Sequence, residues 1–251
     1  MESIKEIRPY SELSSDKKEQ VTIMFDRIAR WYDLLNHLLS FNADRCWRKK
    51  LIRLPGIRKA EKILDIAAGT GDLSILAAKI LKAQIVATDI SEGMLRIAMN
   101  KIQRKGYQDR IRCVLADAEK LPFDAGAFDA IMVAFGVRNF ENPVKGLSEM
   151  FRIVRPGGTV AILEFSVPRI PLFRHLYLFY FRKVVPFIGR LVSGDSDAYR
   201  YLNRSVEAFP QGENFCRMLK DAGFTVADSF PVTLGIARIY VGVKSGVVKI
   251  G

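Results

Sequence analysis

Short apolar runs alternate with stretches of helical periodicity along most of this chain. The runs that predict strands cover residues 62–67, 84–89, 110–116, 128–134 and 158–165, and the helical stretches lie near 71–81, 91–104 and 143–153. Because a helix between two strands lets them run in the same direction, this alternation predicts an α/β fold with a mostly parallel sheet. Two further runs, 223–230 and 233–243, are joined by a turn too short for a helical crossover, so we expect them to pair antiparallel.

The amino-terminal part predicts a helical cap that precedes the sheet. Residues 1–13 predict a loose arm, and from about Ser14 the apolar residues recur at a helical spacing. These apolar residues are Val21, Met24, Phe25, Ile28, Trp31 and Leu35. We therefore expect one domain over 1–251, with a helical cap over 1–55 and a Rossmann-like core over 56–251.

Two segments of the core depart from the alternation. Arg155-Pro156-Gly157-Gly158 predicts a turn before a strand that begins at Thr159, because proline stops a helix and glycine accepts left-handed backbone angles. A helical insertion is expected at about 168–208, and its part 171–190 combines aromatic and aliphatic residues with arginine and lysine. The residues leave three interpretations of that part open: a helix at a membrane interface, the wall of an isoprenoid channel, and a buried helix or dimer contact.

Composition and charge narrow the functional classes. With 251 residues, 49% of them hydrophobic, the chain can bury a full core without disulfides or metals. Its three cysteines are widely spaced and accompanied by only two histidines, so we expect a reduced, cytoplasmic environment and no metal site. A formal charge of +12 favours an anionic partner without separating nucleic acid from phospholipid or acidic ligand. We find no signal-peptide pattern and no apolar run near the ~20 residues of a membrane span.

The most specific chemical signal is the segment 63–72, Ile-Leu-Asp-Ile-Ala-Ala-Gly-Thr-Gly-Asp, followed by Asp89 at the end of the next predicted strand. Gly69 and Gly71 remove side chains where the backbone turns and approaches a ligand, and Thr70 adds a hydroxyl near the next helix start. The carboxylate of Asp89 can accept hydrogen bonds from both hydroxyls of a ribose, which predicts a nucleoside site. A turn without a ligand, and a helix cap at Asp89, are the alternatives.

The kind of nucleoside follows from what surrounds the glycines. A dinucleotide site needs a third glycine under its pyrophosphate, but this chain has Asp72-Leu73-Ser74 after Gly71. S-adenosylmethionine carries no phosphate and has a cationic sulfur and an ammonium, so it suits a crevice rich in carboxylates. The candidate carboxylates are Asp65, Asp72, Asp89 and Asp117. Asp117 follows the third strand, where it would accept from the amino group of adenine or lie in an exposed loop.

Several separate motifs make the chain resemble the ubiquinone/menaquinone biosynthesis C-methyltransferase family from about Val21 to Gly242. They are Tyr32-Asp33-Leu34-Leu35-Asn36 with Ser40 and Trp47, Ala68-Gly69-Thr70-Gly71-Asp72, Phe135-Gly136-Val137-Arg138-Asn139, Arg155-Pro156-Gly157-Gly158 with Leu163-Glu164-Phe165, and Gly194-Asp195-Ser196-Asp197-Ala198-Tyr199-Arg200-Tyr201-Leu202. The resemblance implies a class I S-adenosylmethionine-dependent methyltransferase fold, whose seven-stranded sheet has an antiparallel last strand. It also implies a prenylated quinol as methyl acceptor, with a demethylmenaquinol preferred and a benzoquinol of the ubiquinone pathway as the alternative.

The motifs and the resemblance together assign roles to particular residues. The candidates for cofactor binding are Asp65, Gly69, Thr70, Gly71, Asp89, Asp117, Ala118 and Ala134, the last at a position where serine is common in the family. Near the acceptor, Arg138 would stabilise a phenolate or orient a water, Asn139 would position the same oxygen, and Tyr32 would hydrogen-bond the ring substituents. From the residues alone, Arg138 and Asn139 equally suit a surface turn, and Tyr32 suits core packing.

The expected partners follow from the acceptor. A lipophilic quinol favours peripheral association with an anionic membrane at the inner face of the cell membrane, and a homodimer stays open. Nucleic acid is not expected, because the chain has neither an Asn-Pro-Pro-aromatic motif nor a Pro-Cys nucleophile. The rival functions are an RNA methyltransferase and a non-catalytic lipid-binding or scaffold protein.

Overall fold

A seven-stranded sheet forms the centre of the computed structural model, which describes residues 7–10, 12–193 and 195–246. The strands are β1 (Lys62–Ile66), β2 (Gln84–Asp89), β3 (Ile111–Leu115), β4 (Phe128–Ala134), β5 (Val154–Phe165), β6 (Val226–Val232) and β7 (Ala237–Val243). Their order is β3-β2-β1-β4-β5-β7-β6. The strands β1 to β5 pair in parallel, whereas β7 pairs antiparallel with both β5 and β6. The order reverses between β1 and β4, and α/β sheets bind ligands at the carboxyl ends of such strands.

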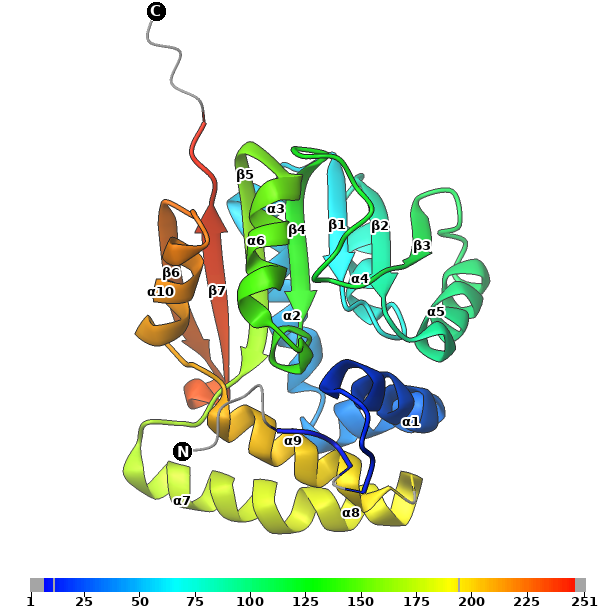
Figure 1. Cartoon of the computed structure of the whole chain (residues 1–251), viewed down its shortest axis with the longest axis vertical. Coiled ribbons are helices and arrows are strands. Elements are labelled where there is room, and N and C mark those ends of the chain that lie inside the picture. The colour runs from blue at the N-terminus through cyan, green and yellow to red at the C-terminus, as the bar shows by residue number, and fades with distance from the viewer. Residues whose placement is uncertain (1–6, 11, 194, 247–251) are drawn as a thin grey trace, which may run out of the picture.

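Helices pack on both faces of the sheet (Figure 1). One face carries α2 (Ala43–Ile52), α3 (Pro55–Arg58), α4 (Asp72–Ile80) and α5 (Glu92–Arg104), and the other carries α6 (Pro143–Ile153) and α10 (Glu213–Asp221). Side chains alternate between the two faces along each strand, so Ile63 joins the first core and Leu64 the second. Each strand of the centre is therefore covered on both sides by apolar packing.

The predicted elements match the observed ones most closely where the pattern is least ambiguous. The sequence of β4, Phe-Asp-Ala-Ile-Met-Val-Ala, is almost continuously apolar because both of its faces are buried, and its bounds were predicted correctly. The bounds of α6 are also confirmed, since Pro143 begins the helix and the Asn142 side chain accepts from the Lys145 N–H. The antiparallel pairing of the last two strands is confirmed by the register of β6 on β7.

Two sequence predictions are wrong. The turn expected at residues 155–158 lies inside β5, which begins at Val154 and shifts its register against β4; Gly157, at φ 78°, donates its N–H to the Lys244 carbonyl at 2.8 Å. The arm expected over residues 1–13 is not loose at the residues that the structure describes, because Ile7 and Tyr10 are buried in an apolar cluster with helical residues such as Met24 and Tyr177. Residues 1–6 and 11 lie outside the described residues.

The cap helices cover the carboxyl ends of the parallel strands (Figure 1). They are α1 (Lys17–Leu39), α7 (Pro171–Phe179), a π-helical turn η2 (Tyr180–Val184), α8 (Val185–Ser193) and α9 (Ser196–Ala208). They share an apolar cluster of their own, separate from the two cores of the sheet, which includes Met24, Tyr177, Val185 and Tyr201. Within the described ranges, no helix combines the length and hydropathy needed to cross a membrane.

Candidate functional site

A cavity of about 70 Å³, which we call the crevice, lies beneath α1 where the carboxyl ends of β1 and β4 meet. The residues that follow these strands, Ala67 and Phe135, have positive φ values of 53° and 63°, which are costly for side chains other than glycine. Gly136 lies so close that a Cβ on it would be 2.6 Å from the Ala67 Cβ. Such backbone strain is concentrated at ligand sites, so it supports the switch point of the sheet as the binding site.

Asp89 ends β2 and forms part of the crevice wall. One carboxylate oxygen accepts from the Gly69 N–H at 2.8 Å, and the other accepts from the Ser91 N–H at 2.9 Å. Burial raises the pKa of Asp89, while these backbone donors act in the opposite direction. An ionised carboxylate offers about four lone-pair sites. Asp89 is therefore oriented by the backbone and keeps acceptor capacity on both oxygens, as two ribose hydroxyls require.

Asp117 and Ala118 also line the crevice, beyond the end of β3. One Asp117 oxygen accepts from the Glu119 N–H at 2.9 Å, and the other accepts from the Lys18 ammonium of α1 at 2.7 Å. The hydrogen bond to Asp117 raises the pKa of Lys18. The acid that we expected at an adenine amino group thus forms an ion pair with the cap.

Four of the expected cofactor residues lie outside the crevice wall. Asp65 is buried beneath it, where it accepts from the Ser74 hydroxyl at 2.5 Å and where burial raises the pKa of its carboxyl to about 7. Gly71 caps α4 at φ 82°, and a Cβ there would approach the Ala98 Cβ to 3.2 Å. Ala134 packs against the sheet core, and the Thr70 hydroxyl points toward α1.

A second cavity of about 40 Å³, the inner chamber, adjoins the crevice and shares Tyr32, Phe135 and Asn139 with it. Arg138 and Tyr201 also line it. Three buried polar atoms on these residues, Arg138 Nε, Asn139 Oδ1 and Tyr201 Oη, have no hydrogen-bond partner in the part of the chain that the structure describes. Because buried polar groups are normally paired, these atoms suit a ligand that carries polar groups of its own.

Glu164 of β5 binds Arg138 through both of its carboxylate oxygens. Its Oε1 accepts from the Arg138 backbone N–H at 3.2 Å, and its Oε2 accepts from Arg138 Nη1 at 3.0 Å. Arg138 Nη1 also donates to the Phe135 carbonyl at 2.5 Å. Glu164 has no solvent exposure, and burial raises its pKa while the Arg138 charge acts in the opposite direction. The guanidinium is therefore fixed on one edge, and its Nε is left for another acceptor.

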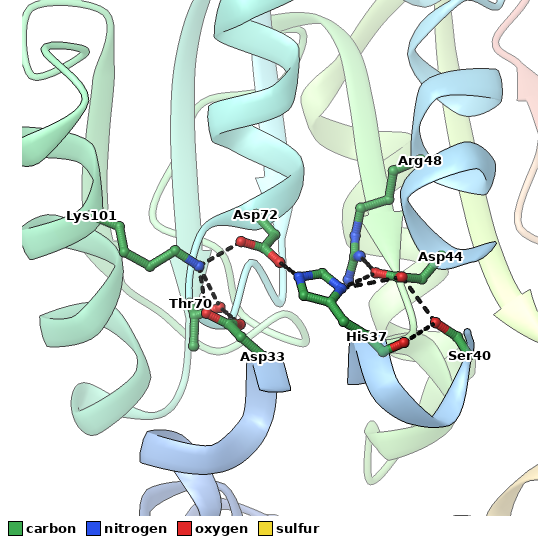
Figure 2. A network of polar contacts seen from close by, with 8 residues as sticks. All are labelled: Asp33, His37, Ser40, Asp44, Arg48, Thr70, Asp72 and Lys101. Carbon is green, nitrogen blue, oxygen red and sulfur yellow. Dashed lines mark hydrogen bonds and ion pairs between the residues drawn. The ribbon is translucent and has the colours of Figure 1, made fainter. Parts of the chain in front are cut away.

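Figure 2 shows a polar network that joins α1 to the glycine turn after β1. Asp33 of α1 accepts a hydrogen bond from the Thr70 hydroxyl. Lys101 of α5 donates to Asp33 at 2.6 Å and to Asp72 at 2.5 Å. Burial raises the pKa of the Asp72 carboxyl, but the Lys101 charge outweighs burial together with the other contacts, so that the net pKa is lowered.

The network continues to α2 through His37, which lies between two carboxylates (Figure 2). His37 Nδ1 is 3.0 Å from Asp44 Oδ2, and His37 Nε2 is 3.4 Å from Asp72 Oδ2. Arg48 pairs with the same oxygen of Asp44, and the Ser40 hydroxyl donates to the other at 2.9 Å. These contacts fix the carboxyl end of α1 over the glycine turn. Among the described residues, no group of three or more His, Cys, Asp or Glu side chains could hold a metal ion.

Several of these residues were missed by sequence reasoning. Glu164 had a usable signal, because an acid inside an apolar strand is rarely fully buried unless it is paired. Asp33 and Lys101 had none, since their partners lie more than one element away along the chain, and the same holds for the contact of His37 with Asp72. Tyr201 lies within one of the family motifs but received no role. Only the structure shows that its hydroxyl lines the same cavity as the unpartnered atoms of Arg138 and Asn139.

The family model described as the ubiE/COQ5 methyltransferase family matches residues 13–244. A demethylmenaquinone methyltransferase of Bacteroides fragilis is 42% identical over 240 residues, which cover 95% of this chain and 97% of that protein. One of Thermus thermophilus is 46% identical, over 87% of this chain and 99% of that protein. A ubiquinone/menaquinone biosynthesis C-methyltransferase UbiE of a Geobacter species is 43% identical, over 92% of this chain and 98% of that protein.

Solved structures share the fold at lower sequence identity. A SAM-dependent methyltransferase of Thermotoga maritima matches with a TM-score of 0.64 and 17% identity, over 90% of this chain and 100% of that one. One from Aquifex aeolicus matches with a TM-score of 0.56 and 18% identity, over 79% of this chain and 88% of that one. Together with the seven-stranded sheet and its antiparallel β7, they confirm the expected fold class.

Proposed function

This chain belongs to the ubiE/COQ5 methyltransferase family, and from this we propose that it transfers a methyl group from S-adenosylmethionine to a ring carbon of a prenylated quinol. The names of the Bacteroides and Thermus relatives favour a demethylmenaquinol as the acceptor. The name of the Geobacter relative makes a benzoquinol of the ubiquinone pathway the second candidate. The observation that supports this function best is the inner chamber, where unpartnered polar atoms lie beside a carboxylate-lined crevice.

The crevice fits the cofactor by the chemistry of its walls. When bound, S-adenosylmethionine supplies a methyl group on a positively charged sulfur. Asp89 would hold the two ribose hydroxyls, and Gly69 would let the backbone approach. Asp117 and Ala118 would hold the adenine once Lys18 releases the Asp117 carboxylate. Asp65, Thr70, Gly71 and Ala134 lie outside the wall, so they would act indirectly, Thr70 and Gly71 through the shape of the turn and Asp65 and Ala134 through the strands β1 and β4 beneath the crevice.

The inner chamber would activate the acceptor. A ring carbon attacks a methyl group only when the ring is electron-rich, so a phenolic hydroxyl must lose its proton or nearly lose it. Arg138 keeps its positive charge and donates from Nε to the developing phenolate. Asn139 Oδ1 would accept from a water molecule that takes the phenolic proton, and the ring carbon would lose its own proton to water after it has taken the methyl group. Tyr201 Oη would pair with the second ring oxygen. Tyr32, which lines both cavities, would close them against water.

The test is direct methyl transfer with defined acceptors. The purified protein is incubated with S-adenosylmethionine and either a demethylmenaquinol or a ubiquinone-pathway benzoquinol, and the products are weighed by mass spectrometry. We expect the demethylmenaquinol to gain one methyl group, and Arg138→Gln to abolish the gain while cofactor affinity is kept. Arg155→Gln is the matched control, because Arg155 is exposed at the amino end of β5.

Three outcomes would contradict the proposal in different ways. Methyl transfer into RNA without transfer to a quinol would establish the RNA methyltransferase. Cofactor binding without transfer to any quinol would establish the scaffold protein. Full activity of Arg138→Gln would remove Arg138 from the chemistry and leave the reaction standing.

We also propose that the protein works at the inner face of the cell membrane. The helices α7 and α8 lie along the outer edge of the cap (Figure 1). They carry large apolar side chains that are 62–76% exposed, and we call these side chains the apolar stripe: Leu172, Leu176, Phe179, Phe187 and Leu191. Exposed Lys183 lies in the same segment, and the chain has a formal charge of +12. An amphipathic helix with these features suits the surface of an anionic bilayer.

Vesicle flotation tests this location. We expect the protein to float with phosphatidylglycerol vesicles, more weakly with phosphatidylcholine vesicles, and to be released by salt. The double variant Leu176→Asp/Phe179→Asp should stay in solution, whereas Val144→Asp, at a 54% exposed position of α6, should still float. If the protein floats with neither kind of vesicle, the proposal is contradicted. If the protein is instead a dimer in solution and the double variant is a monomer, the stripe is a homodimer contact.

A further inference from the structure

A third cavity of about 350 Å³, the apolar cavity, lies between the carboxyl end of α1, the start of α2 and the helix α7. Its wall is mainly aliphatic and aromatic and includes Leu39, Trp47, Phe173, Leu176, Phe181 and Ile236. Two polar groups in this wall are bonded within the protein: Thr233 Oγ1 accepts from Trp47 Nε1 at 2.7 Å, and the Tyr180 hydroxyl donates to the Leu39 carbonyl at 3.1 Å. The buried Tyr177 hydroxyl, also in the wall, has no hydrogen-bond partner among the described residues. Apart from that one group, the cavity offers mostly dispersion contacts and suits a largely apolar ligand.

The apolar cavity and the inner chamber are neighbours that share wall residues. Phe165 and Leu202 line both, and Asn36 of α1 lies in both walls as well. The Phe165 ring stacks on Phe135 with centroids 4.3 Å apart, and its centroid is 6.4 Å from that of Phe181. A row of three aromatic rings thus runs from the crevice, past the inner chamber, to the apolar cavity.

The other end of the apolar cavity reaches the molecular surface at the apolar stripe. Leu176 belongs to both the cavity wall and the stripe, and it is 62% exposed. Phe41, in the turn between α1 and α2, is 80% exposed and also lines the cavity, with its ring 6.0 Å from that of Tyr180. The cavity thus joins the inner chamber to the face that we assign to the membrane.

We propose that the apolar cavity binds the prenyl chain of the methyl acceptor. The quinol ring occupies the inner chamber, the chain passes Phe165 and Leu202, and its remaining units leave beside Leu176 and Phe41. This inference rests on the proposed function, since it names where that function's substrate places its tail. An alkyl chain matches the wall because it has no polar group to pair and gains free energy from every methylene removed from water.

The experiment compares two acceptors that differ only in the chain: farnesyl naphthohydroquinone and unprenylated naphthohydroquinone. We expect kcat/KM to be at least about tenfold higher for the farnesyl compound, because its chain is buried in the cavity. Ala43→Phe fills the cavity with a ring and should reduce that ratio to about one. Cys46→Phe is the matched control, because it places the same ring on the exposed side of α2 and should keep the ratio.

A second measurement does not depend on turnover or on the folding of Ala43→Phe. Trp47 lines the cavity, so in a Trp31→Phe background its fluorescence reports on the cavity alone. Farnesol, which carries the chain without the ring, should shift that emission and compete with the farnesyl acceptor. Equal kcat/KM for the two acceptors, or farnesol without effect on Trp47, overturns the tail site and leaves the methyltransferase standing. Failure to methylate either acceptor overturns the proposed function, and the inference falls with it.

Discussion

Replacing Glu164 by glutamine removes the countercharge of Arg138 while keeping the shape of the side chain. Glu164 is fully buried, and both of its oxygens accept from Arg138, one from the backbone and one from the guanidinium. Oε2 also accepts from the Phe165 N–H at 3.3 Å. A glutamine carbonyl can keep the contacts of only one of the two oxygens, and its NH₂ group must then face an N–H donor. The substitution therefore leaves a buried cation without a countercharge and a donor opposite a donor.

The size of the effect follows from burial. Removing one partner of a buried ion pair costs about 3 to 5 kcal/mol, because the remaining charge stays desolvated without compensation. We expect Glu164→Gln to lower the free energy of unfolding by about 3 kcal/mol, since one hydrogen bond survives. An exposed pair is worth less than about 1 kcal/mol, so Glu207→Gln, whose partner Arg182 is 54% exposed, is the matched control.

A double-mutant cycle in urea denaturation separates the pair from its surroundings. Arg138→Gln added to Glu164→Gln removes the stranded charge, so the double variant should regain most of the lost stability while methyl transfer to the quinol stays absent. Glu164→Gln alone should lower kcat and keep cofactor affinity, because Asp89 and the crevice are unchanged. If the two substitutions are additive, or if Glu164→Gln costs as little as Glu207→Gln, the pair does not hold Arg138 as argued.

Three further expectations address the crevice and its support. Asp89→Ala should weaken S-adenosylmethionine binding roughly 30- to 150-fold in calorimetry, because two hydrogen bonds to a carboxylate are lost, and unchanged affinity would contradict the assigned crevice. Gly71→Ala should lower the free energy of unfolding by about 1 to 2 kcal/mol from its positive φ, plus the contact with Ala98; Gly106→Ala, at φ 72° with nothing within 4 Å, should show the strain alone. Burial raises the pKa of Asp65 to about 7, so the folded state binds its proton more tightly and stability should fall between roughly pH 4 and pH 7. Asp65→Asn should flatten that fall in pH-dependent urea denaturation, and an unaltered slope would contradict the shift.

The sheet and its crossovers were predictable because their signals are local. The strand at Phe128–Ala134 and the helix at Pro143–Ile153 each carry their own periodicity and end signals within one segment. The start of β5 was not predictable, because residues 155–158 have the composition of a turn. They are paired with Lys244 beside the neighbouring strand β7: its carbonyl accepts from the Gly157 N–H and its N–H donates to the Gly158 carbonyl. A backbone partner that lies 87 positions away along the chain leaves no trace in the local pattern.

In the candidate site, too, local signals were predictable and contacts between distant segments were not. The position of Asp89 at the carboxyl end of β2 followed from strand and turn spacing, and it lines the crevice. Thr70 shows what spacing does not reveal. Its place after Gly69 predicts a hydroxyl facing the ligand, but Asp33 of α1 takes that hydroxyl. Which way a side chain on a tight turn points is decided by the element packed above the turn, here a helix from another part of the chain.

That helix also decides how the crevice is reached. Three residues of α1 form hydrogen bonds with polar groups beside the crevice. Lys18 donates to Asp117, Asp26 accepts from the Ser91 hydroxyl at 2.5 Å, and Asp33 accepts from the Thr70 hydroxyl. The crevice measures about 70 Å³, whereas small-molecule pockets begin at roughly 300 Å³. An adenosine that takes Asp117 must therefore displace Lys18, and room for it requires α1 to move outward. Because Tyr32 of the same helix lines both the crevice and the inner chamber, we expect cofactor binding in the crevice to change the shape of the inner chamber.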